Sequence, residues 1–169
     1  MRSVVLMAFF GVTCIAVSPA NAVNNKWYAG ASCHQINASS PSVKVALGDE
    51  PDGYIGTLTN QSKDKEAIVS CPIVKDDVRI LNATVRVNDL TAKDEVACHL
   101  ATQQPDGSIG EQVSAFTGIV KTDTNIELTF PKQKAFSGGG YFMRCKIPPM
   151  IEGSNPSGII NYRVEEQEG

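Results

Sequence analysis

Histidine is scarce in this chain, and so are the signatures of most enzyme classes. Among 169 residues there are two histidines, His34 and His99, so catalysis by a histidine base has only these two candidates. The chain contains no Gly-x-Ser-x-Gly, the pattern that places a serine nucleophile on a sharp turn. Gly138-Gly139-Gly140 precedes an expected strand, whereas phosphate-binding loops open a helix, so we interpret it as a flexible hairpin turn. These absences disfavour nucleotide binding and hydrolysis by a catalytic triad.

Metal-binding patterns are also missing. Cys33-His34 and Cys98-His99 each join two possible ligands, but neighbouring residues on a strand point to opposite faces and do not chelate one ion together. Zinc ligands usually have two or more residues between them. The acidic turns do not match the spacing of an EF-hand, which leaves only weak calcium binding open. We therefore expect no metal site and no cofactor.

The charge balance is only mildly acidic. The chain has 18 acidic and 15 basic residues and a formal net charge of −3. A protein without a basic surplus binds nucleic acid poorly, because affinity for nucleic acid comes largely from neutralising phosphates. We expect no nucleic-acid partner. Glu165, Glu166 and Glu168 at the C-terminus are interpreted as a frayed acidic tail.

The N-terminus has the three parts of a secretory signal peptide. Arg2 is followed by an apolar run from Val4 to Val17, and small residues flank a cleavage site between Ala22 and Val23. The run is shorter than the roughly 20 apolar residues of a membrane-spanning helix. A lipid-modified cysteine would end the apolar run, whereas Cys14 lies inside it, so the sequence disfavours a lipoprotein. We expect residues 1–22 to be a signal peptide and residues 23–169 to be one secreted or periplasmic domain, not membrane-bound after cleavage.

Four cysteines remain once Cys14 leaves with the signal, and an even number in an exported chain predicts two disulfides. Three pairings of Cys33, Cys71, Cys98 and Cys145 are possible. We favour Cys33–Cys71 and Cys98–Cys145, because strands that follow each other in sequence are usually neighbours in space.

The mature chain has the pattern of an all-β protein. Glycine, proline, asparagine, aspartate and serine cluster about every 8 to 15 residues, which is typical of turns in sandwiches and barrels. Between the clusters, apolar and polar residues alternate with period two, which predicts sheets with one face packed on the core and one face exposed to solvent. We predict an antiparallel β-sandwich, Ig-like or jelly-roll-like. The expected strands are residues 26–35, 43–47, 54–60, 67–73, 78–88, 95–102, 109–120, 126–130, 141–147 and 159–164.

No convergent catalytic set stands out, so the leading hypothesis is a non-enzymatic domain that binds a protein or glycan partner or has a structural role. One alternative is a secreted hydrolase that uses His34 or His99 with a nearby Asp or Ser. Another is an inhibitor or effector that presents the disulfide-held loop from Gln103 to Ile109. The sequence does not specify an oligomeric state. Five aromatic residues would form a partner platform if exposed, but burial statistics favour the core: Trp27, Tyr28, Tyr54, Tyr141 and Tyr162.

The cysteines and the strands around them form a recognisable arrangement. It consists of Cys71-Pro72-Ile73, Val96-x-Cys98-x-Leu100, Tyr141-x-x-x-Cys145-x-Ile147-Pro148 and Ile160-x-Tyr162-Arg163-Val164-Glu165. This arrangement resembles small secreted proteins of Gram-negative bacteria that are themselves uncharacterised. The resemblance implies a shared β fold and periplasmic or extracellular residence, and it implies no activity. In a bacterium the sequons at Asn37, Asn60 and Asn82 would have no role in glycosylation.

Overall fold

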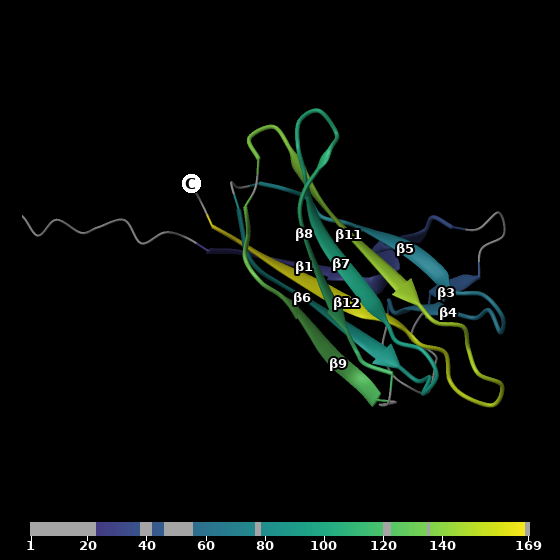
Figure 1. Cartoon of the computed structure of the whole chain (residues 1–169). Coiled ribbons are helices and arrows are strands. Elements are labelled where there is room, and N and C mark those ends of the chain that lie inside the picture. The colour runs from purple at the N-terminus through teal and green to yellow at the C-terminus, as the bar shows by residue number, and fades with distance from the viewer. Residues whose placement is uncertain are drawn as a thin grey trace, which may run out of the picture.

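The computed structural model describes residues 23–37, 42–45, 56–76, 79–119, 123–134 and 136–167. The expected signal peptide, Tyr54 and Glu168 lie outside these residues. The described chain is an all-β sandwich of two antiparallel sheets, as the alternating pattern predicts (Figure 1). Its only helical element is the single turn of 3-10 helix at Gly30–Ser32. Within the described residues, no helix has the length and apolar character needed to span a bilayer.

The larger sheet has seven strands. Long strands β12 and β6 form its centre, with β1 and β4 beside β12 and with β9 and β10 beside β6. Strand β3 pairs with β4 at the margin. The strands are β1 (Val23–Ala29), β3 (Val43–Val45), β4 (Leu58–Asn60), β6 (Arg79–Asp89), β9 (Asp123–Phe130), β10 (Gln133–Lys134) and β12 (Gly158–Gln167).

The smaller sheet has five strands in the order β2-β5-β11-β7-β8, all antiparallel. In Figure 1 the hairpin between β7 and β8 and the hairpin before β11 extend together beyond the body of the sandwich. The strands are β2 (His34–Gln35), β5 (Ala67–Pro72), β7 (Ala97–Gln103), β8 (Ile109–Phe116) and β11 (Gly140–Ile147).

The core lies between the sheets and follows the period-two pattern. In β7, Cys98 and Leu100 point inward and are fully buried, whereas His99 between them points outward. Strand β12 contributes Tyr162, whose hydroxyl donates a 2.7 Å hydrogen bond to the Pro72 carbonyl of the opposite sheet. Tyr28 stacks on the Tyr162 ring with centroids 4.7 Å apart. The core is therefore fixed by side chains from both sheets.

Residues 26–35 do not form the single strand expected from the sequence. The chain leaves the larger sheet after β1, makes the 3-10 turn at Gly30–Ser32 and enters the smaller sheet as β2. Gly30 allows this crossing, because a Cβ atom at this position would lie 2.0 Å from the Ile159 carbonyl oxygen. One short turn thus connects the two layers.

Both disulfides have the favoured connectivity, Cys33–Cys71 and Cys98–Cys145. Each lies within the five-stranded sheet and does not join the two sheets to each other. Cys98 and Cys145 are register partners on β7 and β11, and Cys71 of β5 bonds to Cys33 immediately before β2. The disulfides therefore brace one sheet internally.

The expected frayed acidic tail is wrong for Glu165 and Glu166. Both belong to β12, and the Glu166 side chain is fully buried. Its carboxylate pairs with Lys26 of β1 at 2.5 Å, and Lys26 also contacts Asp76 at 2.8 Å. A buried carboxylate needs such a partner to offset its lost hydration. This cluster fastens the N-terminal strand to the C-terminal one.

The aromatic residues divide between core and surface. Tyr141 and Tyr162 are buried, as burial statistics favour. Trp27 is the exception, because 58% of it is exposed on the outer face of β1. Its ring lies under the Arg163 guanidinium, 5.3 Å from ring centroid to Arg163 Cζ. The expectation that Trp27 belongs to the core is wrong.

Candidate functional site

A row of polar side chains crosses the outer face of the five-stranded sheet. The row follows the strand register from one edge of the sheet to the other, because register partners on antiparallel strands point to the same face. Four of its members are neighbours of a cysteine in the sequence, so the disulfides lie directly beneath it. In spatial order the row is His34, Ser70, Arg144, His99 and Ser114.

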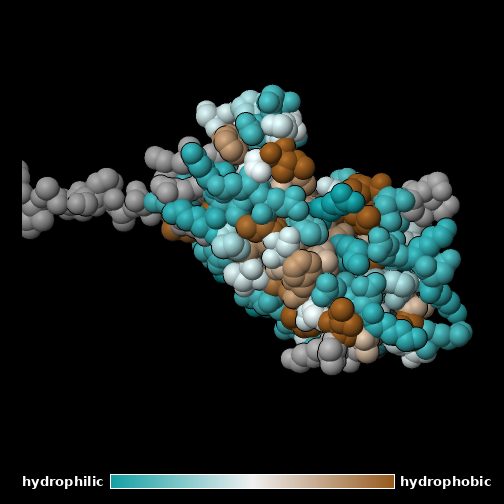
Figure 2. All heavy atoms as spheres, viewed as in Figure 1, coloured by the Kyte–Doolittle hydropathy of each residue, from teal (hydrophilic) through white to brown (hydrophobic). Residues whose placement is uncertain are grey.

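A groove of about 350 Å³ lies on this face, where β5, β11, β7 and β8 meet. The walls of the groove are largely apolar. Over the face of the molecule seen in Figure 2, hydrophobic patches are separated by hydrophilic side chains. Such a lining, with a few directed polar groups, is typical of ligand-binding sites. The lining residues are Ile68, His99, Ile109, Gln112, Phe142, Arg144 and Lys146.

A bend in β8 forms the wall of the groove that contains Ile109. The register between β7 and β8 shifts between Ala101 and Gln103, so β8 carries an additional residue there. Such a bulge turns the strand and redirects its side chains. Ile109, beyond the bulge, is 57% exposed and lines the groove. A regular β8 would not place Ile109 in this position.

The hairpin between β7 and β8 and the hairpin before β11 are closely packed against each other. A Cβ atom at Gly139 would lie 2.0 Å from the Gln103 carbonyl oxygen, and one at Gly110 would lie 2.4 Å from the Phe136 ring. Lys75 donates hydrogen bonds to the carbonyls of Phe136 and Gly139. The triple glycine does form a hairpin turn, in which close packing requires Gly139 and a positive φ of 72° favours glycine at position 138.

The two cations of the groove have different surroundings. Lys146 forms ion pairs with Asp94 at 3.4 Å and Glu66 at 3.7 Å. Arg144 is exposed, and in the part of the chain that the structure describes it has neither an ion-pair nor a hydrogen-bond partner. Its neighbours on the adjacent strands are Ser70 and His99, which carry no carboxylate. Arg144 is thus a cation available to a ligand.

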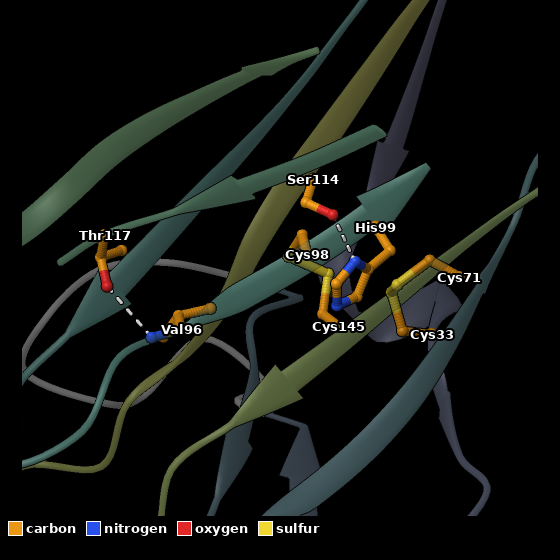
Figure 3. Close-up of a disulfide and its surroundings, with 8 residues drawn as sticks. All are labelled: Cys33, Cys71, Val96, Cys98, His99, Ser114, Thr117 and Cys145. Carbon is orange, nitrogen blue, oxygen red and sulfur yellow. Dashed lines mark hydrogen bonds between the residues drawn. A yellow bond between two sulfur atoms is a disulfide. The ribbon is translucent and has the colours of Figure 1, made fainter. Parts of the chain in front are cut away.

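His99 meets one condition expected of a catalytic base. Its Nδ1 atom forms a 2.7 Å hydrogen bond with Ser114 Oγ on the neighbouring strand (Figure 3), and the Phe116 ring packs edge-on against the imidazole. Within the described ranges no carboxylate contacts the ring, whose other hydrogen-bonding neighbour is Gln112 at 3.5 Å. The pair therefore lacks the acidic third member that orients a histidine in a triad.

His34, the other candidate base, lies outside the groove. It is exposed on the short strand β2, two strands away from Arg144. No described residue forms a hydrogen bond or an ion pair with its side chain. His34 and His99 therefore cannot act on the same small substrate atom, although both belong to the polar row.

Other sequence candidates have structural roles or lie elsewhere. Asn60 is fully buried, and its amide donates hydrogen bonds to the carbonyls of Lys65, Ile147 and Pro148, so this sequon is not a glycosylation site. The loop from Gln103 to Ile109 is a tight hairpin in which Asp106 accepts two hydrogen bonds from Ser108. Among the described residues there is no group of three or more His, Cys, Asp or Glu side chains that could hold a metal.

Sequence reasoning identified the histidines but missed Phe142, Arg144 and Gln112. The signal for Arg144 was present, because a residue next to an inward cysteine on an alternating strand must point outward. The groove itself was not visible in the sequence, since it depends on strand order and on the bulge in β8.

No protein-family model and no curated protein sequence matches the chain. Some solved structures are distantly similar. One is the enzymatically active domain of tailspike protein 4 of bacteriophage CBA120, with a TM-score of 0.49 and 9% identity over 85% of this chain and 19% of that chain. Another is the Arthrobacter globiformis T6 isomalto-dextranase complexed with panose, with a TM-score of 0.49 and 14% identity over 83% of this chain and 23% of that one.

A third similar structure is the carbohydrate-binding module CBM36 in complex with calcium and xylotriose. Its TM-score is 0.45, with 8% identity over 83% of this chain and 99% of that chain. This chain therefore spans about a fifth of the tailspike and dextranase chains and nearly all of the module. At these identities and TM-scores, the similarities carry no information about what the groove binds.

Proposed function

We propose that this protein is an exported, non-catalytic domain that binds a carbohydrate in the groove of its five-stranded sheet. The observation that carries the proposal is the lining of the groove. Phe142 and the aliphatic side chains of Ile68 and Ile109 offer surfaces for the apolar C–H faces of sugar rings. Arg144 and Gln112 lie beside them as hydrogen-bond donors for sugar oxygens.

The location of the groove favours a ligand recognised by side chains. It lies on the face of the sheet, where the backbone N–H and C=O groups of β11 and β7 are already used in the antiparallel ladders. A peptide that binds by strand addition requires an open sheet edge. A hydroxyl-rich ligand needs only the side-chain donors that this face presents.

Export is supported by the cysteines and by the start of the fold. Both disulfides are buried in the sheet, and disulfides of this kind persist in oxidising compartments. Strand β1 contains Val23, the residue that follows the expected cleavage site, so cleavage there would retain every described residue of the strand. We propose a periplasmic or extracellular location.

Titration calorimetry of the mature chain against neutral and acidic oligosaccharides tests the binding function. We expect saturable binding that Phe142→Ala weakens at least tenfold. Thr129→Ala, at an exposed position on β9 of the other sheet, is the matched control and should leave affinity unchanged. Thermal unfolding of both variants separates lost binding from lost folding. Failure of every oligosaccharide to bind would overturn the proposal.

Hydrolysis is the second candidate, because His99 and Ser114 are in hydrogen-bond contact. The same oligosaccharides, analysed by chromatography after long incubation, test it. We expect no cleavage, since the pair has no orienting carboxylate among the described residues. Cleavage products that disappear in Ser114→Ala would replace the binding function by an enzymatic one.

A further inference from the structure

We infer that the groove selects acidic carbohydrates, and that the bound chain runs across the strands from Arg144 towards Ser70 and His34. This inference rests on the proposed carbohydrate-binding function. It adds the chemical class of the ligand, a sugar chain with carboxylate groups, and a second subsite outside the groove.

The first argument is the state of Arg144. Among the described residues its guanidinium has neither a hydrogen-bond nor an ion-pair partner. The other cation of the groove, Lys146, lies two residues further along β11 and is already paired with Glu66 and Asp94. Arg144 therefore presents an uncompensated planar fork of donors, the geometry that binds a carboxylate through two parallel hydrogen bonds.

The second argument is the composition of the row. Ser70 lies beside Arg144 on one side and His99 on the other, and His34 follows Ser70 at the sheet edge. All of these side chains can donate a hydrogen bond to an oxygen. With neighbouring strands about 4.8 Å apart, the five positions of the whole row, from His34 to Ser114, span roughly 19 Å. The row is therefore long enough to contact successive units of an extended chain.

The third argument is the apolar character of the positions on each side of the polar row. The register positions on one side are Pro72, Phe142 and Ala101, and those on the other side are Ile68 and Ala97, apart from the ion-paired Lys146. A polar row between largely apolar rows matches a chain of sugar rings, whose oxygens alternate with C–H surfaces. The chain as a whole has a net charge of −3, so attraction to acidic sugars arises locally at Arg144.

The direct test compares oligogalacturonates of increasing length with their methyl-esterified, uncharged counterparts in titrations of the mature protein. We expect the acidic series to bind at least tenfold more tightly. Arg144→Gln should remove that preference, and Arg144→Lys, which keeps the charge but not the fork, should retain part of it. Arg86→Gln, on the opposite sheet, is the control for a general loss of positive charge.

His34→Ala tests the second subsite. Short oligomers that fit the groove should bind this variant as they bind the unchanged protein, whereas longer oligomers should lose several-fold in affinity. Equal effects at all lengths, or no effect at any length, would overturn the extension towards β2.

The outcomes separate the inference from the function on which it rests. Equal affinity for acidic and esterified chains, still sensitive to Phe142→Ala, would overturn acid selection and leave carbohydrate binding in place. Loss of both series in Arg144→Gln by the same factor would also overturn acid selection. No binding of either series would remove both proposals.

Discussion

Cys98 and Cys145 face each other across β7 and β11 with their Cα atoms 4.1 Å apart, and their sequence neighbours His99 and Arg144 point outward into the groove. The disulfide thus fixes the two strands that carry the central side chains of the site. Ligand sites depend on such rigid support, because small displacements of directed polar groups weaken binding.

Removal of this bond by the double change Cys98→Ala and Cys145→Ala should lower the free energy of unfolding by about 2–4 kcal/mol. It should also weaken oligosaccharide binding, because β7 and β11 are then joined only by backbone hydrogen bonds. Urea unfolding and calorimetry measure the two effects. The double change Cys33→Ala and Cys71→Ala, which frees only the edge strand β2, is the comparison and should leave the binding of short oligosaccharides that fit the groove unchanged. Equal loss of binding in both variants would contradict this account.

Asp89 should be a second determinant of stability. Its buried carboxylate accepts hydrogen bonds from the backbone N–H groups of Thr91 and Val96 and from the Thr117 hydroxyl. Asp89→Ala would leave buried donors without an acceptor, and we expect a loss of about 3 kcal/mol in urea unfolding. Asp106→Ala, in an exposed turn, should lower the free energy of unfolding much less. A similar decrease in the free energy of unfolding in the two variants would contradict the claim that the buried hydrogen bonds to Asp89 stabilise the fold.

The adjacent residues Gly139 and Gly140 provide a matched pair. A Cβ atom at Gly139 would lie 2.0 Å from a backbone oxygen, whereas at Gly140 the nearest atom is the end of the Gln103 side chain, 3.9 Å away. We expect Gly139→Ala to lower the unfolding temperature by several degrees and Gly140→Ala to change it little. Differential scanning calorimetry measures the unfolding temperature of each variant. An equal shift in the two variants would contradict the close packing of the two hairpins at Gly139.

Stability should decline at alkaline pH. Burial lowers the pKa of Lys26, but hydrogen bonds to Asp76 and Glu166 and the attraction of both carboxylates outweigh it, so the net pKa lies above the ordinary 10.5. Burial, with a smaller contribution from Tyr28, raises the pKa of Tyr162 well above the ordinary 10.0. Both groups hold their protons more tightly in the folded protein than in the unfolded chain.

The stabilisation from these groups is therefore complete below about pH 10 and is lost as the pH rises further. Urea midpoints at pH 8 and pH 11 should show this loss. Tyr162→Phe should start about 1 kcal/mol less stable, because the hydrogen bond to Pro72 is missing, but should lose less between the two pH values. A midpoint independent of pH would contradict the assignment.

Much of the fold follows from local pattern. Alternation correctly places Cys98 and Leu100 inside and His99 outside, since these side chains obey the pleat of a single strand. The disulfide pairing was predicted correctly, but the strands that it joins do not follow each other in sequence: β3 and β4 lie between β2 and β5, and β8, β9 and β10 lie between β7 and β11. The alternation within one strand depends on information contained in a few consecutive residues, whereas the disulfide pairing joins residues 38 and 47 positions apart.

The features that were not predicted depend on contacts between distant segments. The crossing at Gly30 requires the close approach of Ile159, and the burial of Glu166 requires Lys26, which lies 140 residues away. The exposure of Trp27 follows from the edge position of β1, which composition does not specify. The groove likewise requires four strands to come together, and only the outward direction of each side chain could be predicted.

The central claim is that the outer face of the five-stranded sheet binds an oligosaccharide. Its most direct test is a nuclear magnetic resonance titration of the isotope-labelled mature protein with oligogalacturonate. We predict saturable shifts of backbone amides in β5, β7, β8 and β11, greatest near Arg144 and Phe142, and unchanged amides in β6, β9 and β12. Shifts confined to the seven-stranded sheet, or no shifts with any acidic or neutral oligosaccharide, would contradict the account.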